Sequence, residues 1–422
     1  MDHFHYRDSR LHAEDVPLET IAAEVGTPFY CYSRATLQRH HRAYREAFGH
    51  HPHRICYSVK CNSNLAVLDT LVRAGAGLDI VSGGELARAL AVGCPGERIV
   101  FSGVGKTEME MRAALTAGIG MFNVESEPEL VRLDEVARSL GCRAPVSIRV
   151  NPDVDARTHP YISTGLKRNK FGIPHARVEA VYRMALSLAG IEVKGIDCHI
   201  GSQITELSPF IDAARRIKSL VLRLRALGAD IRHVDLGGGL GVPYAPDQTT
   251  PQPSELAAAL VMVMGDLGVT LTVEPGRSIA GNAGVLVCRV EYVKEGEEKR
   301  FIITDAGMND LLRPALYQAH HEVLPVVRRH LAPVWTVDVV GPVCETGDWF
   351  ARDRGMAAMS PGELLAVRSA GAYGFCMSSN YNSRPRPAEV MVSGQRFVVV
   401  RPRESLADLF ASEQMFPGED GS

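Results

Sequence analysis

The chain has 422 residues, a formal net charge of −3, and 45% hydrophobic against 23% charged residues. This length exceeds one ordinary domain, and the composition is typical of a globular protein with a large core. The charge argues against a nucleic-acid-binding or membrane-surface protein. No run approaches the roughly 18 apolar residues of a membrane span, and the N-terminus lacks the pattern of a secretory signal. We therefore expect a cytoplasmic protein.

Nine cysteines are scattered along the chain without a CxxC pair. An odd number of isolated cysteines argues against a disulfide framework and against a zinc site. The paired histidines at 40–41 and 320–321 lack a third ligand. The sequence therefore predicts no metal.

From about residue 50 to residue 275, short apolar runs alternate with segments whose apolar residues recur every three or four positions. This alternation predicts parallel strands joined by crossover helices. Eight such units match the size of a (β/α)8 TIM barrel, while a doubly wound open α/β sheet is the alternative. The eight predicted strands are residues 55–60, 78–81, 99–102, 121–124, 146–150, 196–200, 233–236 and 271–274.

After residue 281 the pattern changes to short β-rich runs separated by Gly and Pro turns. These runs predict a second, mainly antiparallel β domain. The N-terminal residues do not fit the barrel rhythm, and we expect them to join that second domain. The predicted division is residues 30–281 for the barrel, and residues 1–29 with 282–422 for the β-rich domain.

Polar residues close most of the predicted strands. Lys60 ends the first, and Glu274 ends the eighth. Asp79 lies in the second and His199 in the sixth. In a TIM barrel the active site gathers at the C-terminal ends of the strands. So many polar strand ends favour the barrel over the open sheet.

Glycines follow the last two strands, in the run Gly-Gly-Gly-Leu-Gly at 237–241 and in Gly276-Arg277. Glycines allow backbone N–H groups to approach an anion, helped by the start of a following helix. Barrels often build a phosphate site from these two loops. A simple tight turn is the alternative for the first run, but the second loop favours phosphate binding.

Lys60 is the candidate nucleophile. Burial and nearby positive charge are expected to lower its pKa and free its amine. A single strand-end lysine is more often a surface residue. Beside a phosphate site, however, it is suited to form a Schiff base with pyridoxal phosphate. Glu274 favours this cofactor over a Schiff-base aldolase, because a carboxylate keeps the pyridine nitrogen protonated, and the His199 ring could stack on the pyridine.

Eight motifs along nearly the whole chain resemble the fold-type III pyridoxal-phosphate decarboxylases. They are residues 57–64 (Tyr-Ser-Val-Lys-Cys-Asn-Ser-Asn), 79–85, 170–172, 199–203, 235–239, 274–277, 341–345 and 371–373. The resemblance implies that Lys60 carries the cofactor, with Glu85 and Lys170 as supporting residues. It implies a cofactor site made of Asp79, His199, Ser202, Gly238, Gly239, Glu274, Pro275, Gly276, Arg277 and Tyr373.

Within that family the sequence resembles the diaminopimelate-specific branch more than the ornithine or arginine enzymes. Arg313 and Tyr317 match positions that bind a distal carboxylate, and Glu345 follows Cys344 where ornithine enzymes have aspartate. Arg277 and Arg313 can grip carboxylates through paired hydrogen bonds, while Glu345 can accept an ammonium. Ornithine would leave an arginine unpaired. The resemblance thus implies decarboxylation of meso-2,6-diaminopimelate to L-lysine and CO2, the last step of lysine biosynthesis.

The resemblance also implies that Cys344 donates the proton to the product and comes from the partner subunit of a homodimer. An inert buried thiol is the alternative for Cys344. Tyr373 is expected to bind phosphate or substrate, with plain packing in the second domain as its alternative. The segment 153–168 is a candidate lid.

Several rivals stay open from the sequence. A racemase or a small carrier protein shares the barrel but not the Cys344-Glu345 region. A non-catalytic homologue would be expected to lack Lys60 or Cys344, and both are present. An ornithine- or arginine-type decarboxylase would share the cofactor but not the substrate.

Overall fold

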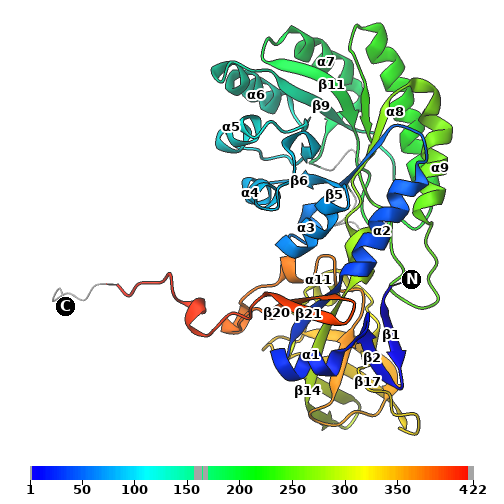
Figure 1. Ribbon diagram of the computed structural model, residues 1–422, viewed down its shortest axis with the longest axis vertical. Helices are drawn as coiled ribbons and strands as arrows, with labels where there is room; N and C mark the ends of the chain where they lie inside the picture. The colour runs from blue at the N-terminus through cyan, green and yellow to red at the C-terminus, as the bar shows by residue number, and fades with distance from the viewer. Residues whose placement is uncertain (1, 156–163, 165–169, 417–422) are drawn as a thin grey trace. The chain divides into compact units, whose positions relative to one another are not determined.

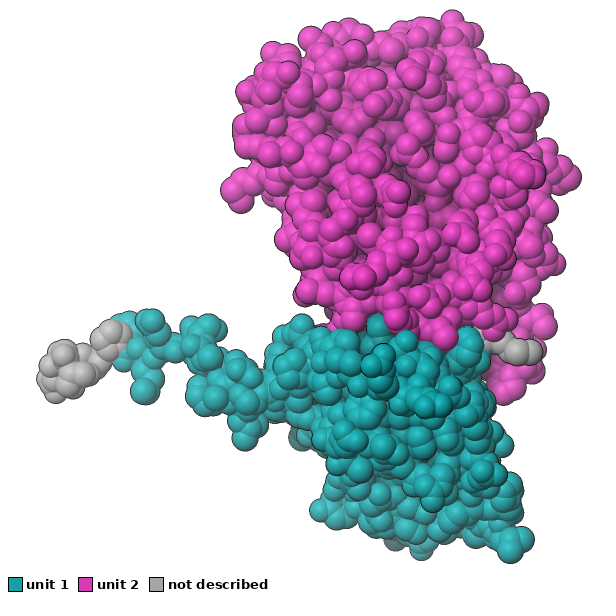
Figure 2. Space-filling model, in the orientation of Figure 1, with its two compact units in different colours: residues 1–33, 284–370, 377–422 teal, residues 34–283, 371–376 magenta. Residues whose placement is uncertain are grey.

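The computed structural model describes residues 2–155, 164 and 170–416 (Figure 1). The chain divides into two compact units, coloured separately in Figure 2. We call residues 34–283 with 371–376 the barrel unit, and residues 1–33, 284–370 and 377–422 the β unit. Among the described residues, every helix is too short or too polar to cross a membrane.

The barrel unit contains eight parallel strands in a closed ring. The ring closes because β13 pairs with β5 and β8 pairs with β9, all in parallel. Each strand overlaps one of the eight predicted runs, so the TIM barrel is confirmed and the open sheet is excluded. The strands are β5 (His53–Ser58), β6 (Gly77–Ile80), β7 (Ile99–Phe101), β8 (Met121–Val124), β9 (Ala144–Asn151), β11 (Ile191–Asp197), β12 (His233–Asp235) and β13 (Thr270–Val273), with a short β10 (Ile173–Pro174) beside β9.

Helices lie on the outside of the ring (Figure 1). Several begin at a capping side chain: the hydroxyls of Ser82, Thr107 and Ser126 each accept a backbone N–H of the first helical turn. Such caps stabilise a helix start by about 1 kcal/mol. The helices are α2 (Arg34–Ala47), α3 (Leu65–Arg73), α4 (Gly83–Ala91), α5 (Glu108–Thr116), α6 (Glu127–Ser139), α7 (Val178–Ser187), α8 (Ser208–Ala226), α9 (Pro253–Met264) and α10 (Arg277–Ala280).

The β unit is mainly antiparallel and includes the N-terminal segment, as predicted. In its large sheet, β4 pairs antiparallel with β14 and parallel with β20, so strands from distant parts of the sequence are neighbours. Its elements are β1 (Phe4–Arg7), β2 (Arg10–Ala13), β3 (Val16–Pro17), α1 (Leu18–Val25), β4 (Phe29–Ser33), β14 (Gly284–Glu295), β15 (Arg300–Thr304), α11 (Arg313–Tyr317), β16 (Val323–Pro325), β17 (Val334–Val340), β18 (Trp349–Ala357), β19 (Leu364–Val367), β20 (Ala388–Ser393) and β21 (Arg396–Arg401).

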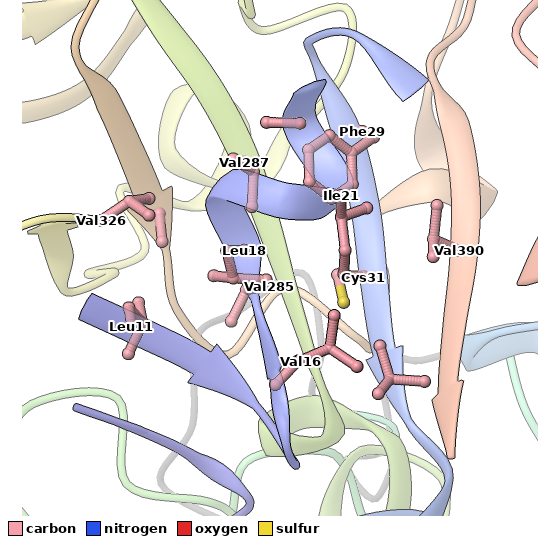
Figure 3. Close-up of a cluster of buried hydrophobic side chains, with 14 of the residues drawn as sticks. Leu11, Val16, Leu18, Ile21, Phe29, Cys31, Val285, Val287, Val326 and Val390 are labelled. Carbon is pink, nitrogen blue, oxygen red and sulfur yellow. The ribbon is translucent and has the colours of Figure 1, made fainter. Parts of the chain in front are cut away.

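The core of the β unit explains why the first residues belong to it (Figure 3). Leu18 and Ile21 of α1 pack with Phe29 of β4, Val287 of β14 and Val390 of β20, and all five are fully buried. Burying a side chain of this size contributes about 1.5–3 kcal/mol. The N-terminal segment therefore supplies a substantial part of this core.

Candidate active site

Lys60 lies just beyond the first barrel strand. β5 ends at Ser58, and Lys60 is in the single 3₁₀ turn Val59–Cys61. Its Nζ donates to Asp79 Oδ2 at 2.7 Å, and Ser58 Oγ donates to the same oxygen at 2.8 Å. Lys60, predicted at the end of the first strand, thus contacts Asp79 of the second strand directly. Because 36% of the Lys60 side-chain surface is exposed, a ligand can still reach the amine.

The electrostatic environment of Lys60 differs from the prediction. Desolvation by the surrounding protein disfavours the ammonium, but the carboxylates of Asp79 and Glu274 outweigh it, so the pKa of Lys60 is raised. The predicted lowering was wrong. It assumed positively charged neighbours, whereas the folded barrel places carboxylates there.

Buried carboxyl groups gather at the ends of β6, β11, β12 and β13. Burial raises the pKa of Glu274 well above its usual range, and the charges of Asp235, Asp79 and Asp197 raise it further. Burial likewise raises the pKa of Asp235 to about 6. Arg149 balances part of this charge, since it donates to Glu125 at 2.8 Å and lies 3.7 Å from Asp197. An acidic cluster of this kind favours a cationic ligand group.

His199 follows the end of β11 and contacts the glycine loop. Its Nδ1 accepts the backbone N–H of Gly238 at 3.2 Å. Burial, helped by the charges of Arg149 and Lys60, holds the pKa of His199 well below its usual value. The ring is therefore neutral at physiological pH, a form that suits stacking on a protonated pyridine.

The glycine loops come too close for larger residues. A Cβ at Gly238 would lie 2.2 Å from the carbonyl oxygen of Glu274, and a Cβ at Gly239 would lie 2.5 Å from that of Gly201. Likewise, a Cβ at Gly276 would lie 3.0 Å from Ser58 Cβ. The helix that follows residues 237–241, α9, begins only at Pro253. In the second loop, α10 begins directly after Gly276.

Arg277 joins several predicted residues into one cluster. Its Nε and Nη2 donate to Ser202 Oγ at 3.2 and 3.0 Å, and its Nη1 donates to Tyr244 OH at 2.6 Å. Its guanidinium lies 4.8 Å from the ring centroid of Tyr373. The Tyr373 N–H in turn donates to Cys61 O at 2.7 Å. Residues 371–376 thus belong to the barrel unit, although the sequence analysis assigned Tyr373 to the second domain.

Glu85 and Lys170, the two residues expected to support Lys60, lie in different environments. Glu85 Oε2 accepts the N–H of Val81 at 2.7 Å, and burial raises the pKa of Glu85 to about 7, with Asp79 and Lys60 also acting on it. Lys170 is exposed beside the ring of Phe171, and in the described residues it makes no contact with Lys60. Most of the candidate lid at 153–168 lies outside the residues that the structure describes.

Sequence reasoning did not assign site roles to several residues at the barrel mouth. Arg149 and Asp197 received no role, Asp235 was only part of the 235–239 motif, and nothing in the sequence distinguished Tyr244. Each acts through a partner that is distant along the chain, so only the fold could identify it.

In the β unit, Arg313 and Tyr317 are the first and last residues of α11. Arg313 is 5% exposed, and its Nη1 donates to His321 Nε2 at 2.9 Å. The other ring nitrogen of His321 lies 2.7 Å from the carbonyl oxygen of Arg368. The guanidinium therefore has a fixed partner that holds its orientation.

Cys344 and Glu345 lie in the loop between β17 and β18. Cys344 is exposed, so the alternative of an inert buried thiol does not hold for this chain. Its N–H donates to Asn382 Oδ1 at 2.9 Å, and Glu345 Oε2 accepts from Tyr381 OH at 2.9 Å. The carboxylate of buried Asp348 also holds this loop in place.

Asp348 was not identified from the sequence. Its two carboxylate oxygens accept the N–H groups of Val343 at 2.7 Å and Met308 at 2.6 Å. These bonds connect the Cys344 loop to the turn that precedes α11. A carboxylate that accepts two backbone N–H groups is a strong local constraint.

The residues of the barrel mouth fit a phosphorylated pyridine. Among the described residues, Oδ1 of Asp79 and Oδ1 of Asp197 are buried without a hydrogen-bond partner, so both can accept from a cationic group that binds in this cluster. Gly238 and Gly276 form a close-fitting cradle, and Lys60 offers a reachable amine. Barrel, lysine and cradle together define a pyridoxal-phosphate-dependent enzyme.

Comparisons with known proteins agree. The family model "Pyridoxal-dependent decarboxylase, pyridoxal binding domain" matches residues 34–281. The diaminopimelate decarboxylase of Vibrio cholerae is 57% identical over 99% of this chain and 100% of its own length. That of Pseudomonas aeruginosa is 56% identical, with the same coverage. The crystal structure of the Helicobacter pylori enzyme with L-lysine has a TM-score of 0.91 at 42% identity, covering 94% of this chain and 99% of that one. The chain belongs to the diaminopimelate decarboxylase family.

Proposed function

We propose that this protein decarboxylates meso-2,6-diaminopimelate at its D-centre to give L-lysine and CO2, the last step of lysine biosynthesis. The similarity to diaminopimelate decarboxylases over nearly the full chain carries this proposal. The lysine bound to the Helicobacter pylori relative is the product that the reaction would release.

The residues of the barrel unit bind and tune the cofactor. Lys60 would hold it covalently, and Ser202, Arg277, Gly238 and Gly239 would receive its phosphate, with Pro275 and Gly276 shaping the second loop. When bound, pyridoxal phosphate supplies the electron sink for the bond that breaks. Glu274 stabilises a proton on the ring nitrogen, since a cation there lowers the carboxyl pKa that burial has raised. The neutral ring of His199 would pack against the pyridine ring of the cofactor.

Substrate recognition requires two amino-acid heads to be held. Arg313 binds the distal carboxylate, because a guanidinium offers two parallel donors and its His321 contact fixes its direction. Glu345 accepts the distal ammonium, and Tyr317 lies at the other end of α11 from Arg313. Arg277 and Tyr373 contribute to binding both the cofactor phosphate and the substrate.

Cys344 donates the proton that replaces the lost carboxylate. Its exposure and the hydrogen bonds that hold its loop support this role. We propose that it acts in the partner subunit's site within a homodimer. The nine free cysteines suit a reducing, cytoplasmic setting.

An ornithine- or arginine-type decarboxylase of the same family is the second candidate. It is disfavoured by buried Arg313, because a substrate without a distal carboxylate would not supply the anion that this guanidinium is proposed to bind.

The deciding experiment measures CO2 release from meso-diaminopimelate, ornithine, arginine and lysine under the same conditions. We expect kcat/KM for diaminopimelate to exceed the others by at least about a thousandfold, the range reached when a buried polar group loses its partner. R313Q should reduce kcat/KM for diaminopimelate, whereas R352Q, an exposed arginine on β18, should not. A preference for ornithine would overturn the substrate assignment and leave the cofactor assignment intact.

A further inference from the structure

A second cavity lies at the N-terminal end of the barrel. It has a volume of about 500 Å3. It lies where β5, β6 and β7 begin, near His53, Gly77 and Arg98. At about 3.3 Å per residue along β5, Arg54 is on the order of 20 Å from Lys60. The cavity is therefore separate from the active site, at the other end of the strands.

The lining of this cavity is strongly basic. Arg45 comes from α2, Arg54 from β5 and Arg98 from the turn before β7. Glu97 is the one acidic residue among the lining residues, so the lining carries a net charge of +2 before any histidine is counted. Within the described part of the chain, none of the three arginines forms an ion pair or a side-chain hydrogen bond. The three guanidinium groups are exposed and outnumber the one carboxylate at this cavity, and a bound anion would relieve their mutual repulsion.

Two histidines add hydrogen-bonding groups. His41 lies four residues before Arg45 on α2, so both lie on the same helix face, and His41 is only 2% exposed. Burial, helped by Arg45, lowers the pKa of His41 to about 4. His53, which also lines the cavity, uses its Nδ1 on the carbonyl oxygen of His51 at 2.8 Å.

The floor of the cavity is apolar. Ile55 and Cys56 are 6% and 2% exposed, and Gly77 has no side chain. A Cβ at Gly77 would lie 2.5 Å from the carbonyl oxygen of Arg98, so the floor cannot be filled from that position. A basic rim over an apolar floor matches a small molecule with a charged end and an organic body. The volume lies within the range of about 300–1,000 Å3 typical of small-molecule sites.

We propose that this cavity is a binding site for an organic phosphate with two or more negative charges, such as a nucleoside diphosphate. Arg45, Arg54 and Arg98 bind the phosphate groups through paired guanidinium hydrogen bonds. The organic body lies against Ile55 and Cys56. This site is independent of the decarboxylase proposal, because it shares no residue with the active site.

The test is calorimetric titration of the holoenzyme with ADP and with inorganic pyrophosphate. The holoenzyme is required because the cofactor's own phosphate then fills the site at Ser202 and Arg277. We expect one equivalent of ADP to bind per chain, with an affinity that falls as salt is added. R54Q and R98Q should each weaken ADP binding about tenfold or more. R42Q, an exposed arginine on α2 outside the cavity lining, should bind as the parent does.

Two further measurements make the result decisive. R54Q and R98Q should retain the parent decarboxylation rate, which shows that the active site is intact. Without ADP, their thermal midpoints should equal or exceed that of the parent, because like-charge repulsion is removed. No saturable ADP binding to the parent, or unchanged binding in a R45Q/R54Q/R98Q variant, would overturn the proposal. Binding of pyrophosphate but not of ADP would overturn the role of the apolar floor.

Discussion

At the scale of single residues, the charge around Lys60 is the most consequential feature of the barrel mouth. Asp79 accepts from its ammonium, while Glu274, Asp235 and Asp197 form a buried acidic cluster close by. A protonated pyridine adds a positive charge to this cluster, which lowers the carboxyl pKa values that burial raises. The same carboxylates that keep Lys60 charged in the free protein thus prepare the site for the cofactor's ring.

A single buried acid in the β unit gives a testable pH dependence. Asp310 is 1% exposed, accepts the Gly307 N–H at 2.9 Å and the Asn309 amide at 3.1 Å, and burial raises its pKa to about 7. A folded-state pKa above the unfolded value favours the folded protein fully below about pH 4. That contribution is lost as the pH rises through the folded pKa.

We therefore expect D310N to change the pH dependence of stability. Between about pH 5 and pH 8 the free energy of unfolding of D310N should fall by about 2–3 kcal/mol less than that of the parent. The new amide can be satisfied, because the buried Oδ1 of Asn309 has no partner among the described residues and could accept from it after a flip. Chemical denaturation at both pH values is the measurement, and parallel curves for the two proteins would contradict the assignment.

At the scale of elements, the loops after β12 and β13 depend on glycine because their backbones touch. G238A would place a Cβ 2.2 Å from the carbonyl oxygen of Glu274, so either the loop or the carboxylate must shift. We expect the affinity for pyridoxal phosphate to fall by about 10- to 100-fold, the loss typical when a neighbour that orients the binding groups is disturbed. Titration of the cofactor-free protein, followed by visible absorbance, measures this.

A matched control is available on α4. The nearest atom to a Cβ at Gly84 is Ser82 Oγ at 3.8 Å, an ordinary contact. G84A should leave cofactor affinity unchanged and stabilise the helix by about 0.5–1 kcal/mol. If G238A bound the cofactor as tightly as G84A, the close-packed cradle would be wrong.

The Cys344 loop gives a second prediction at this scale. D348A removes the acceptor for the N–H groups of Val343 and Met308, each worth about 1.5–3 kcal/mol when the acceptor is charged. We expect kcat to fall at least tenfold, with little change in KM or in cofactor absorbance, because the loop carries Cys344, the proposed proton donor. D353A, an exposed aspartate on β18, is the control. A change in KM alone would contradict a role in positioning Cys344.

The sequence predicted the elements better than their surroundings. Apolar runs are local, so all eight barrel strands and the β-rich second part could be identified, and Lys60, Asp79 and Arg277 could be assigned to the barrel mouth. The acidic environment of Lys60, the link from Arg277 to Tyr244 and the anchoring by Asp348 could not. Each depends on side chains that are distant in sequence and meet only when the strands close into a ring or the loop folds.

At the scale of the whole molecule, each of the two units is built from segments that are separate in the sequence. The first 33 residues complete the core of the β unit, where β4 lies between β14 and β20, while residues 371–376 return to the barrel unit. The sequence indicated that the N-terminal segment joins the β unit, because its residues do not follow the strand–helix alternation of the barrel. The second could not be predicted, because six residues carry no periodicity.

If Cys344 acts in the partner subunit's site, mixing two inactive variants should restore activity. K60A and C344A should each be nearly inactive, but a refolded or exchanged equimolar mixture should recover about a quarter of the parent activity, since half the dimers are mixed and each has one complete site. Steady-state CO2 release measures the recovery. No recovery, with mixed dimers confirmed by mass spectrometry, would show that Cys344 acts within its own chain.

The residue assignments of the barrel mouth all depend on Lys60 as the cofactor's attachment point. Reduction of the holoenzyme with borohydride, followed by peptide mapping, tests this most directly. We predict loss of the visible absorption band and a single phosphopyridoxyl tag on the peptide that contains Lys60. A tag on another lysine, or a colourless protein with no tag, would contradict the account.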